Sequence, residues 1–240
     1  MIIRLEQPSD YRAVETLTRD AFWNVYRPGC LEHFVLHRYR TNPDFIPELD
    51  FVMEEDGRLI GHIMFSKAEI ARTDGTILPA WTFGPISIHP DFKRKGYGLQ
   101  LLNHAIGEAR KLGVGMLCME GNISFYGHAG FGLASQLHIH YHGEPPEAEV
   151  PYFLAQELIP GYLSGVEGTY STPKGYFVAT DDPVAFEAYE ATFPAKEKRI
   201  LPGQFPLFCK TCGKPLPRNE DCAIGTDHQP LFDLCAHCGA

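Results

Sequence analysis

The sequence has no apolar run approaching the ~20 residues that a membrane-spanning helix requires, so we expect no membrane partner. It also lacks, near Met1, the basic segment and long apolar run of a secretion signal, which makes the cytoplasm the expected location. Basic residues are outnumbered: the 240 residues carry a net charge of −9. This balance argues against nucleic acid as a partner, because binding to phosphate backbones depends on a basic surface.

Cysteine is scarce along most of the chain and crowded at its end. Cys30 and Cys118 stand alone, and the other five are Cys209, Cys212, Cys222, Cys235 and Cys238. In a chain without a secretion signal, such clustering indicates a metal site before it indicates disulfides.

Two Cys-x-x-Cys-Gly motifs begin at Cys209 and Cys235. Each motif presents two thiolates, and four thiolates complete the tetrahedral shell of a structural zinc site. We therefore predict that one zinc ion is bound by Cys209, Cys212, Cys235 and Cys238, with iron as the alternative metal and Cys222 as a spare thiol. The motifs resemble zinc-ribbon knuckles. A small domain over residues 201–240 is expected, and metal binding would supply its folding energy.

Residues 1–200 show the periodicities of a sheet with helices on its faces. A helix is expected after Ser9 or Asp10, and another over 98–112 with one apolar stripe. Strands are expected at 51–53, 59–65, 81–88, 116–119, 152–158 and 175–179. Asp56-Gly57 and Asp74-Gly75 are hairpin signals. The fold class is α/β or α+β, with a core over 1–143 and an extension over 144–200.

A basic, glycine-punctuated turn joins the strand at 81–88 to the helix at 98–112. Residues 93–98 read Lys-Arg-Lys-Gly-Tyr-Gly. The start of a helix offers unpaired N–H groups and the positive end of the helix dipole, and Gly96 and Gly98 permit close approach of an anion. A solvated basic turn is the simpler alternative. A Rossmann loop fits poorly because Leu101 stands where a third glycine belongs, and a P-loop lacks its Gly-Lys-Ser/Thr.

This turn resembles motif A of the GNAT acetyltransferases, an apolar strand followed by Arg/Gln-x-x-Gly-x-Gly/Ala, with lysine in the first place. The resemblance implies that the backbone here binds the pantetheine and pyrophosphate of acetyl-CoA. The residues assigned to the cofactor are Ile86, Ser87, Ile88, Lys93, Arg94, Lys95, Gly96, Tyr97, Gly98, Leu99, Asn122 and Phe125. Gly84-Pro85 marks a bulge in the strand, where the family's fold splays to admit the cofactor.

Residues 120–132 resemble motif B of the same family. An aromatic-Tyr pair, Phe125-Tyr126, precedes Gly130-Phe131. The resemblance implies that the Tyr126 hydroxyl protonates the thiolate that leaves when an amine attacks a thioester. Without the resemblance, both aromatic residues would be assigned to the core. The likeness extends over roughly residues 1–180 and is closest to a bacterial subgroup of predicted acetyltransferases. It implies the GNAT fold, a mixed and mostly antiparallel sheet with helices on both faces.

The general base is open at this point. Glu120, His128 and a chain of water molecules are the candidates, because residues 81–88 contain no carboxylate. Three alternating histidines at 138, 140 and 142 could share one face of a strand and bind a metal. A solvent-facing polar strand is the simpler interpretation.

The resemblance predicts an N-acetyltransferase that moves an acetyl group from acetyl-CoA to a primary amine by direct attack. The acceptor is a small molecule or a peptide, and its identity cannot be read from the sequence. The alternative is a non-catalytic GNAT-fold binding module whose zinc ribbon recruits a protein partner. A homodimer is left open beside a monomer.

Overall fold

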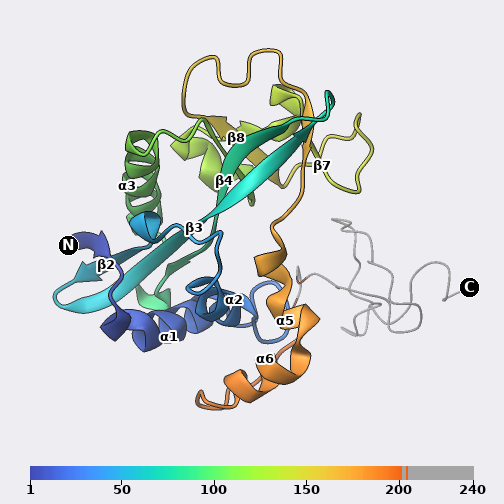
Figure 1. Ribbon diagram of the computed structural model, residues 1–240. Coiled ribbons are helices and arrows are strands. Elements are labelled where there is room, and N and C mark those ends of the chain that lie inside the picture. The colour runs from blue at the N-terminus through green and yellow to red at the C-terminus, as the bar shows by residue number, and fades with distance from the viewer. Residues whose placement is uncertain (202–203, 205–240) are drawn as a thin grey trace, which may run out of the picture.

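The computed structural model describes residues 1–201 and Gln204 (Figure 1). Within these residues one sheet has the strand order β1-β2-β3-β4-β5-β8-β6, while β9 pairs with β3 and β7 pairs with β9. The strands are β1 (Ile2–Leu5), β2 (Phe51–Glu55), β3 (Arg58–Arg72), β4 (Ile77–Ile88), β5 (Met116–Glu120), β6 (Gly132–Leu133), β7 (Ile139–Tyr141), β8 (Phe153–Glu157) and β9 (Gly168–Tyr170). The pairs β4–β5 and β7–β9 are parallel and the others antiparallel, which confirms a mixed, mostly antiparallel sheet.

Helices cover both faces of the sheet, as expected. They are α1 (Tyr11–Phe22), α2 (Glu32–Tyr39), α3 (Tyr97–Lys111), α4 (Ile123–Tyr126), α5 (Val178–Asp181) and α6 (Pro183–Glu190). Neighbouring strand residues point to opposite faces, so Val52 packs with Val14 of α1 and Leu36 of α2, whereas Met53 packs with Leu102 of α3. Figure 1 shows α3 and the α1–α2 pair on opposite sides of the strands.

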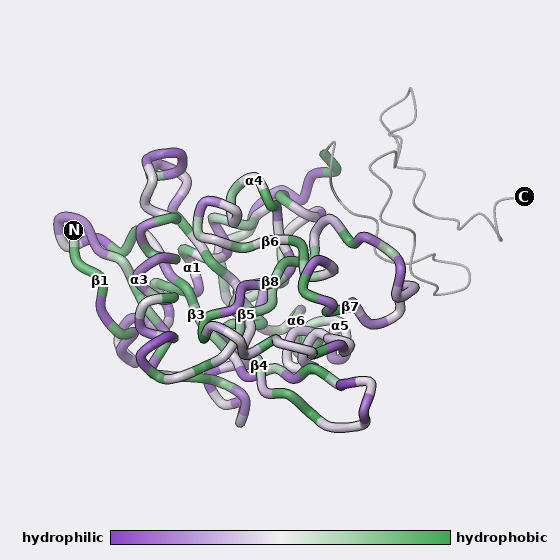
Figure 2. Tube along the Cα trace, turned by 90° about the horizontal axis from the view of Figure 1, so that it is seen from above, coloured by the Kyte–Doolittle hydropathy of each residue, from purple (hydrophilic) through white to green (hydrophobic). Residues whose placement is uncertain are grey.

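Two tight turns have the conformation that their sequences predict. Asp56 and Gly57 both have positive φ (50° and 76°), which suits the hairpin between β2 and β3. Gly75 has φ 82° between β3 and β4. In Figure 2 hydrophilic residues gather in the outer turns of the trace, and hydrophobic ones follow the central elements. No helix among the described residues has the length and apolar character needed to cross a membrane.

The strands β4 and β5 pair over a very short distance. Their register contains only Trp81 with Leu117 and Thr82 with Cys118. Directly beyond, Gly84 has φ 143° and its bond to Pro85 is cis, and the opposite strand β3 shifts register between Ile63 and Phe65. Because β4 bends here, its last residues leave β5, and the sheet is split at the expected bulge.

Two parts of the prediction need correction. Residues 175–179 are not a strand, since Lys174–Phe177 form a 3₁₀-helix that continues into α5. The three histidines do not share a strand face: His138 has φ 57° in the turn before β7, and His142 follows the strand's end. His138 and His142 are exposed, which agrees with a solvated polar segment.

The C-terminal part of the described chain packs against α1 and α2. Phe186 of α6 contacts Phe34 of α2, with ring centroids 5.7 Å apart. Residues 194–201 then run along the segment that joins α1 to α2, where the Glu197 carbonyl accepts hydrogen bonds from Trp23 Nε1 (2.9 Å) and Asn24 Nδ2 (3.0 Å). The domain boundary was predicted between residues 200 and 201. Gln204 lies beyond it and still contacts the first domain, where its Nε2 donates to the Asn24 carbonyl (2.9 Å).

Candidate functional site

A cavity of about 330 Å³ lies where β4 leaves β5. Its lining residues come from the end of β4, the basic turn, the start of α3 and α4. They are Ile86, Ile88, Phe92, Lys93, Arg94, Gly96, Gly98, Leu99, Phe125 and Tyr126. All except Phe92 belong to the site predicted from the sequence.

One end of the cavity is formed by the start of α3. Gly96 precedes the helix with φ 85°, a conformation that L-residues rarely adopt, and Arg94 is also left-handed with φ 61°. This backbone turns the first N–H groups of α3 toward the cavity, where the helix dipole is positive. A Cβ at Gly98 would lie 3.3 Å from Phe125 Cζ, so the Phe125 ring packs closely on the helix start.

The cationic side chains of the turn have different surroundings. Lys93 lines the cavity and its Nζ donates to the Ala21 carbonyl (2.9 Å), while partial burial lowers the pKa of this amine. Arg94 also lines the cavity. Lys95 is turned to the Phe92 ring, with Nζ 5.0 Å from its centroid, and Tyr97 contacts the same ring at 6.0 Å. Of the predicted basic triplet, therefore, only the first two side chains face the cavity.

The other end of the cavity is formed by Tyr126, the last residue of α4. Its ring contacts Phe83 (centroids 5.9 Å apart) and Phe131 (6.1 Å), which holds it in the core beneath α3. Burial raises the pKa of the Tyr126 phenol, and Tyr26 adds to this effect. The phenol therefore stays protonated at neutral pH, so it can serve as a proton donor but not as a base.

The cavity thus extends from the start of α3 to a partly buried tyrosine at a split in the sheet. Residues 16–131 match the model of the acetyltransferase (GNAT) family. Over these residues the chain is similar to the GNAT acetyltransferases. No curated protein gives a significant match.

Two solved structures share the GNAT fold with this chain. The GNAT family N-acetyltransferase YhbS from Escherichia coli, in complex with CoA, has a TM-score of 0.62 and 22% identity, over 73% of this chain and 91% of that one. A GNAT family acetyltransferase from Brucella melitensis, in complex with acetyl-CoA, has a TM-score of 0.56 and 23% identity, over 73% and 97% of the two chains. Both agree with the fold that the resemblance implied.

Besides Lys95, three of the residues assigned to the cofactor do not line the cavity. Ser87 is buried on the opposite face of β4, where its Oγ donates to Thr18 Oγ1 (3.1 Å). Asn122 caps α4, accepting from Ser124 N (2.8 Å). Tyr97 contacts Phe92 instead. Phe92 itself was missed, and the only signal for it was an apolar residue between Pro90-Asp91 and the basic turn.

The two candidate bases lie at different positions relative to the cavity. His128 is exposed in the 3₁₀-turn after α4 and does not line the cavity. Glu120 ends β5, and its Oε1 accepts hydrogen bonds from Tyr141 OH (2.8 Å) and Thr172 Oγ1 (2.7 Å). Glu120 alternates with Met119 along β5 and so points away from the α3 side of the sheet.

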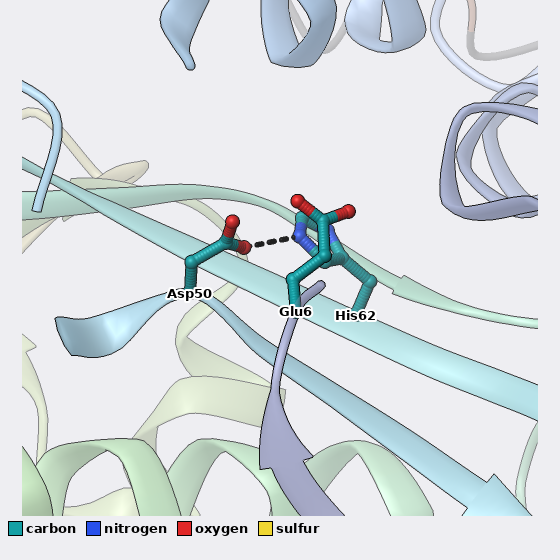
Figure 3. A group of neighbouring side chains, drawn as sticks. All are labelled: Glu6, Asp50 and His62. Atoms are coloured by element: carbon teal, nitrogen blue, oxygen red, sulfur yellow. Dashed lines mark hydrogen bonds and ion pairs between the residues drawn. The ribbon is translucent and has the colours of Figure 1, made fainter. Parts of the chain in front are cut away.

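A second polar cluster lies apart from the cavity, between β1, β2 and β3. Figure 3 shows the side chains of Glu6, Asp50 and His62 converging, with His62 Nε2 2.7 Å from Asp50 Oδ1. One potential ligand atom from each lies within 4.8 Å of the others, a spacing that suits a metal ion. Arg40, however, donates to both carboxylate oxygens of Glu6 (2.9 and 2.7 Å), and its charge opposes a second cation.

Burial dominates the proton equilibria of this cluster. It raises the pKa of Glu6 to about 7 and that of Asp50 to about 6, and lowers the pKa of His62 to about 4. A neutral imidazole beside partly protonated carboxyl groups is the state that avoids burying unpaired charge. We interpret the cluster as a proton-sharing part of the core. The predicted zinc ligands Cys209, Cys212, Cys235 and Cys238 lie outside the described residues.

Proposed function

We propose that the chain transfers an acetyl group from acetyl-CoA to a primary amine by direct attack. The observation that carries this proposal is the cavity, which begins at the start of α3 and ends at a partly buried tyrosine. The family description and the CoA-bound and acetyl-CoA-bound structures of similar fold support the same reading. They favour an enzyme over a non-catalytic binding module.

The assignment of cofactor groups follows the order of the lining residues. The pyrophosphate would bind the N–H groups at Gly96–Gly98, with Lys93 and Arg94 nearby as cations. The pantetheine arm would lie along Ile88 and Ile86, which present an apolar wall. The thioester then reaches Tyr126.

In the proposed reaction the amine nitrogen attacks the thioester carbonyl carbon and the C–S bond breaks. The Tyr126 hydroxyl gives its proton to the departing thiolate, and the new amide nitrogen loses one proton. We propose Glu120 as the acceptor of that proton, directly or through water. Two hydroxyl donors hold its carboxylate one residue from Gly121, where the chain turns toward α4. The acceptor would approach from the face of β5 that carries Glu120.

Two variants test this function. Acetyl-CoA should raise the melting temperature of the wild type by mass action, and Gly96→Asp should abolish the rise because its carboxylate opposes the phosphates. Tyr126→Phe should keep the rise, yet turnover with the best acceptor from an amine panel should fall by roughly 10²-fold. If chemistry is rate-limiting and Tyr126→Phe turns over at the wild-type rate, Tyr126 is not the acid of this reaction.

We also propose that the four tail cysteines hold one structural zinc ion. The spacing of the two Cys-x-x-Cys-Gly motifs supports this, together with the closed shell that four thiolates form. Such a shell leaves no position for substrate, so the metal would serve folding of the tail rather than acetyl transfer.

A further inference from the structure

The cavity has a direction that fixes where an acyl chain would go. Its phosphate end lies at Arg94 and Gly96, and β4 leads away from that end through Ile88 and Ile86. Further back along the same strand stands Phe83, whose ring contacts Tyr126. An extended cofactor arm lying on β4 therefore brings its thioester, and the acyl group on it, to Phe83 and Tyr126.

Tyr126 lines this end of the cavity, and Phe83 and Phe131 pack against its ring from the core; we call these three rings the acyl wall. Their centroids are 5.9 Å (Phe83–Tyr126), 5.7 Å (Phe83–Phe131) and 6.1 Å (Tyr126–Phe131) apart, so each ring contacts the other two. Phe83 and Phe131 are only 5% and 4% exposed. Two of these ring pairs are edge to face and the Phe83–Tyr126 pair is tilted, and packing at these distances leaves no room between the rings for additional methylene groups.

Phe83 is the central member of the acyl wall. Besides Tyr126 and Phe131 it contacts Phe65, with ring centroids 5.2 Å apart, and Phe65 is fully buried behind it. The Phe83 ring therefore cannot swing back to admit a longer chain without displacing a second buried ring. It also directly precedes Gly84, where β4 bends and the split in the sheet begins.

We propose that Phe83 restricts the enzyme to short acyl groups, acetyl and propionyl, by closing the cavity behind the thioester. This specificity rests on the proposed function, because it takes the cavity as the acyl-CoA site. Longer acyl chains would have to displace the ring of Phe83 or leave the chain in solvent, and either outcome weakens their binding relative to acetyl-CoA.

The test measures binding, so it needs no acceptor. Dissociation constants are determined by calorimetry for CoA, acetyl-, butyryl-, hexanoyl- and octanoyl-CoA. In the wild type we expect hexanoyl-CoA to bind at least tenfold more weakly than acetyl-CoA. Phe83→Leu should lower this ratio and Phe83→Ala should lower it further, since each opens more space at the acyl end.

Phe51→Leu is the matched control, a buried aromatic-to-leucine change on β2, where the Phe51 ring contacts His104 of α3 (centroids 4.9 Å apart). It should keep the wild-type ratio. If Phe83→Ala does not fold, Phe83→Leu and Phe131→Leu carry the test. Equal binding of all the thioesters by the wild type would overturn the inference, as would an unchanged ratio in Phe83→Leu. Failure of CoA and acetyl-CoA to bind at all would instead refute the proposed function.

Discussion

The ring of Tyr126 lies directly on the backbone of Gly121. A Cβ added at Gly121 would stand 2.3 Å from Tyr126 Cε2 and 2.8 Å from Met119 Cε, closer than real Cβ contacts come. The φ of Gly121 is outside the left-handed region, so its backbone would accept an L-residue. The absence of a side chain is therefore required by the tyrosine, and Gly121 sets the position of the proposed acid.

Gly121→Ala should displace the Tyr126 ring and lower kcat by roughly 10²-fold, the scale expected for losing a positioned acid. The double variant with Tyr126→Phe should turn over no more slowly than Tyr126→Phe alone, because both changes remove the same hydroxyl contribution. Steady-state kinetics with the best acceptor measures both effects. Gly107→Ala in α3, where a Cβ meets nothing within 4 Å, is the control. Wild-type kcat in Gly121→Ala would contradict this role.

Features that depend on neighbours in the sequence were predictable. The positive φ of Gly57 and Gly75 follows from turn chemistry, and nine residues of the cavity come from two continuous segments that carry recognisable motifs. Strand alternation also places Ser87 on the face of β4 opposite Ile86 and Ile88, although the resemblance had assigned it to the cofactor. Turn conformations and motifs that lie within one continuous segment could therefore be predicted from its sequence.

Features that depend on distant packing were not predictable. The support of Tyr126 by Gly121 and the contact of Gln204 with Asn24 appear only in the folded chain. The strand predicted at 175–179 was wrong for the same reason. Its aromatic and β-branched residues suggested a strand, but a Cβ at Gly175 would lie 2.6 Å from Tyr39 Cζ, so this glycine fits a helical turn packed on α2.

The side chain of Asn24 joins residues 194–201 to the connection between α1 and α2 by hydrogen bonds. Its Oδ1 accepts from Gly29 N (2.8 Å) and Arg199 N (3.1 Å), and its Nδ2 donates to the Glu197 carbonyl. Asn24 has φ 58°, so Asn24→Gly keeps the backbone and removes only these bonds. We expect faster amide exchange at residues 23–31 and 194–201, measured by hydrogen–deuterium exchange, and a loss of about 1–3 kcal/mol of stability.

Asp56→Gly is the matched control for Asn24→Gly, because it also replaces a left-handed residue (φ 50°) in an exposed turn far from this contact. It should leave exchange at 194–201 unchanged. Equal protection of that segment in Asn24→Gly and the wild type would show that the side chain of Asn24 is not what holds it.

The proposed zinc site makes a prediction with an internal control. Purified protein should contain one zinc ion per chain by elemental analysis, and Cys212→Ser or Cys235→Ser should lose it, because three thiolates do not complete the shell. Cys222→Ser should retain the metal, since Cys222 belongs to neither motif. A metal-free wild type, or zinc loss in Cys222→Ser alone, would contradict the assignment of the four ligands.

The cluster around Asp50 predicts a pH dependence of stability. Burial raises the pKa of Asp50 from 3.8 to about 6, so its contribution to the free energy of unfolding is present below pH 4 and is lost as the pH rises through 6. His62, with a pKa lowered to about 4, acts in the opposite sense, losing its contribution as the pH falls through 4. Glu6, whose pKa burial raises to about 7, acts in the same sense as Asp50, so the wild type shows only the sum of the three effects and a variant is needed to separate them.

Asp50→Asn removes the Asp50 titration and keeps an oxygen that can accept the bond from His62 Nε2. The stability of Asp50→Asn relative to the wild type should therefore increase between pH 4 and 7, by on the order of 1–3 kcal/mol, and be constant above pH 7.5. Urea unfolding at half-unit pH intervals measures the difference. Asp56→Asn, an exposed carboxylate in the β2–β3 turn, should give a difference that does not vary over this range. A flat difference for Asp50→Asn would mean that Asp50 is ionised in the folded protein throughout, with its charge compensated by Arg40.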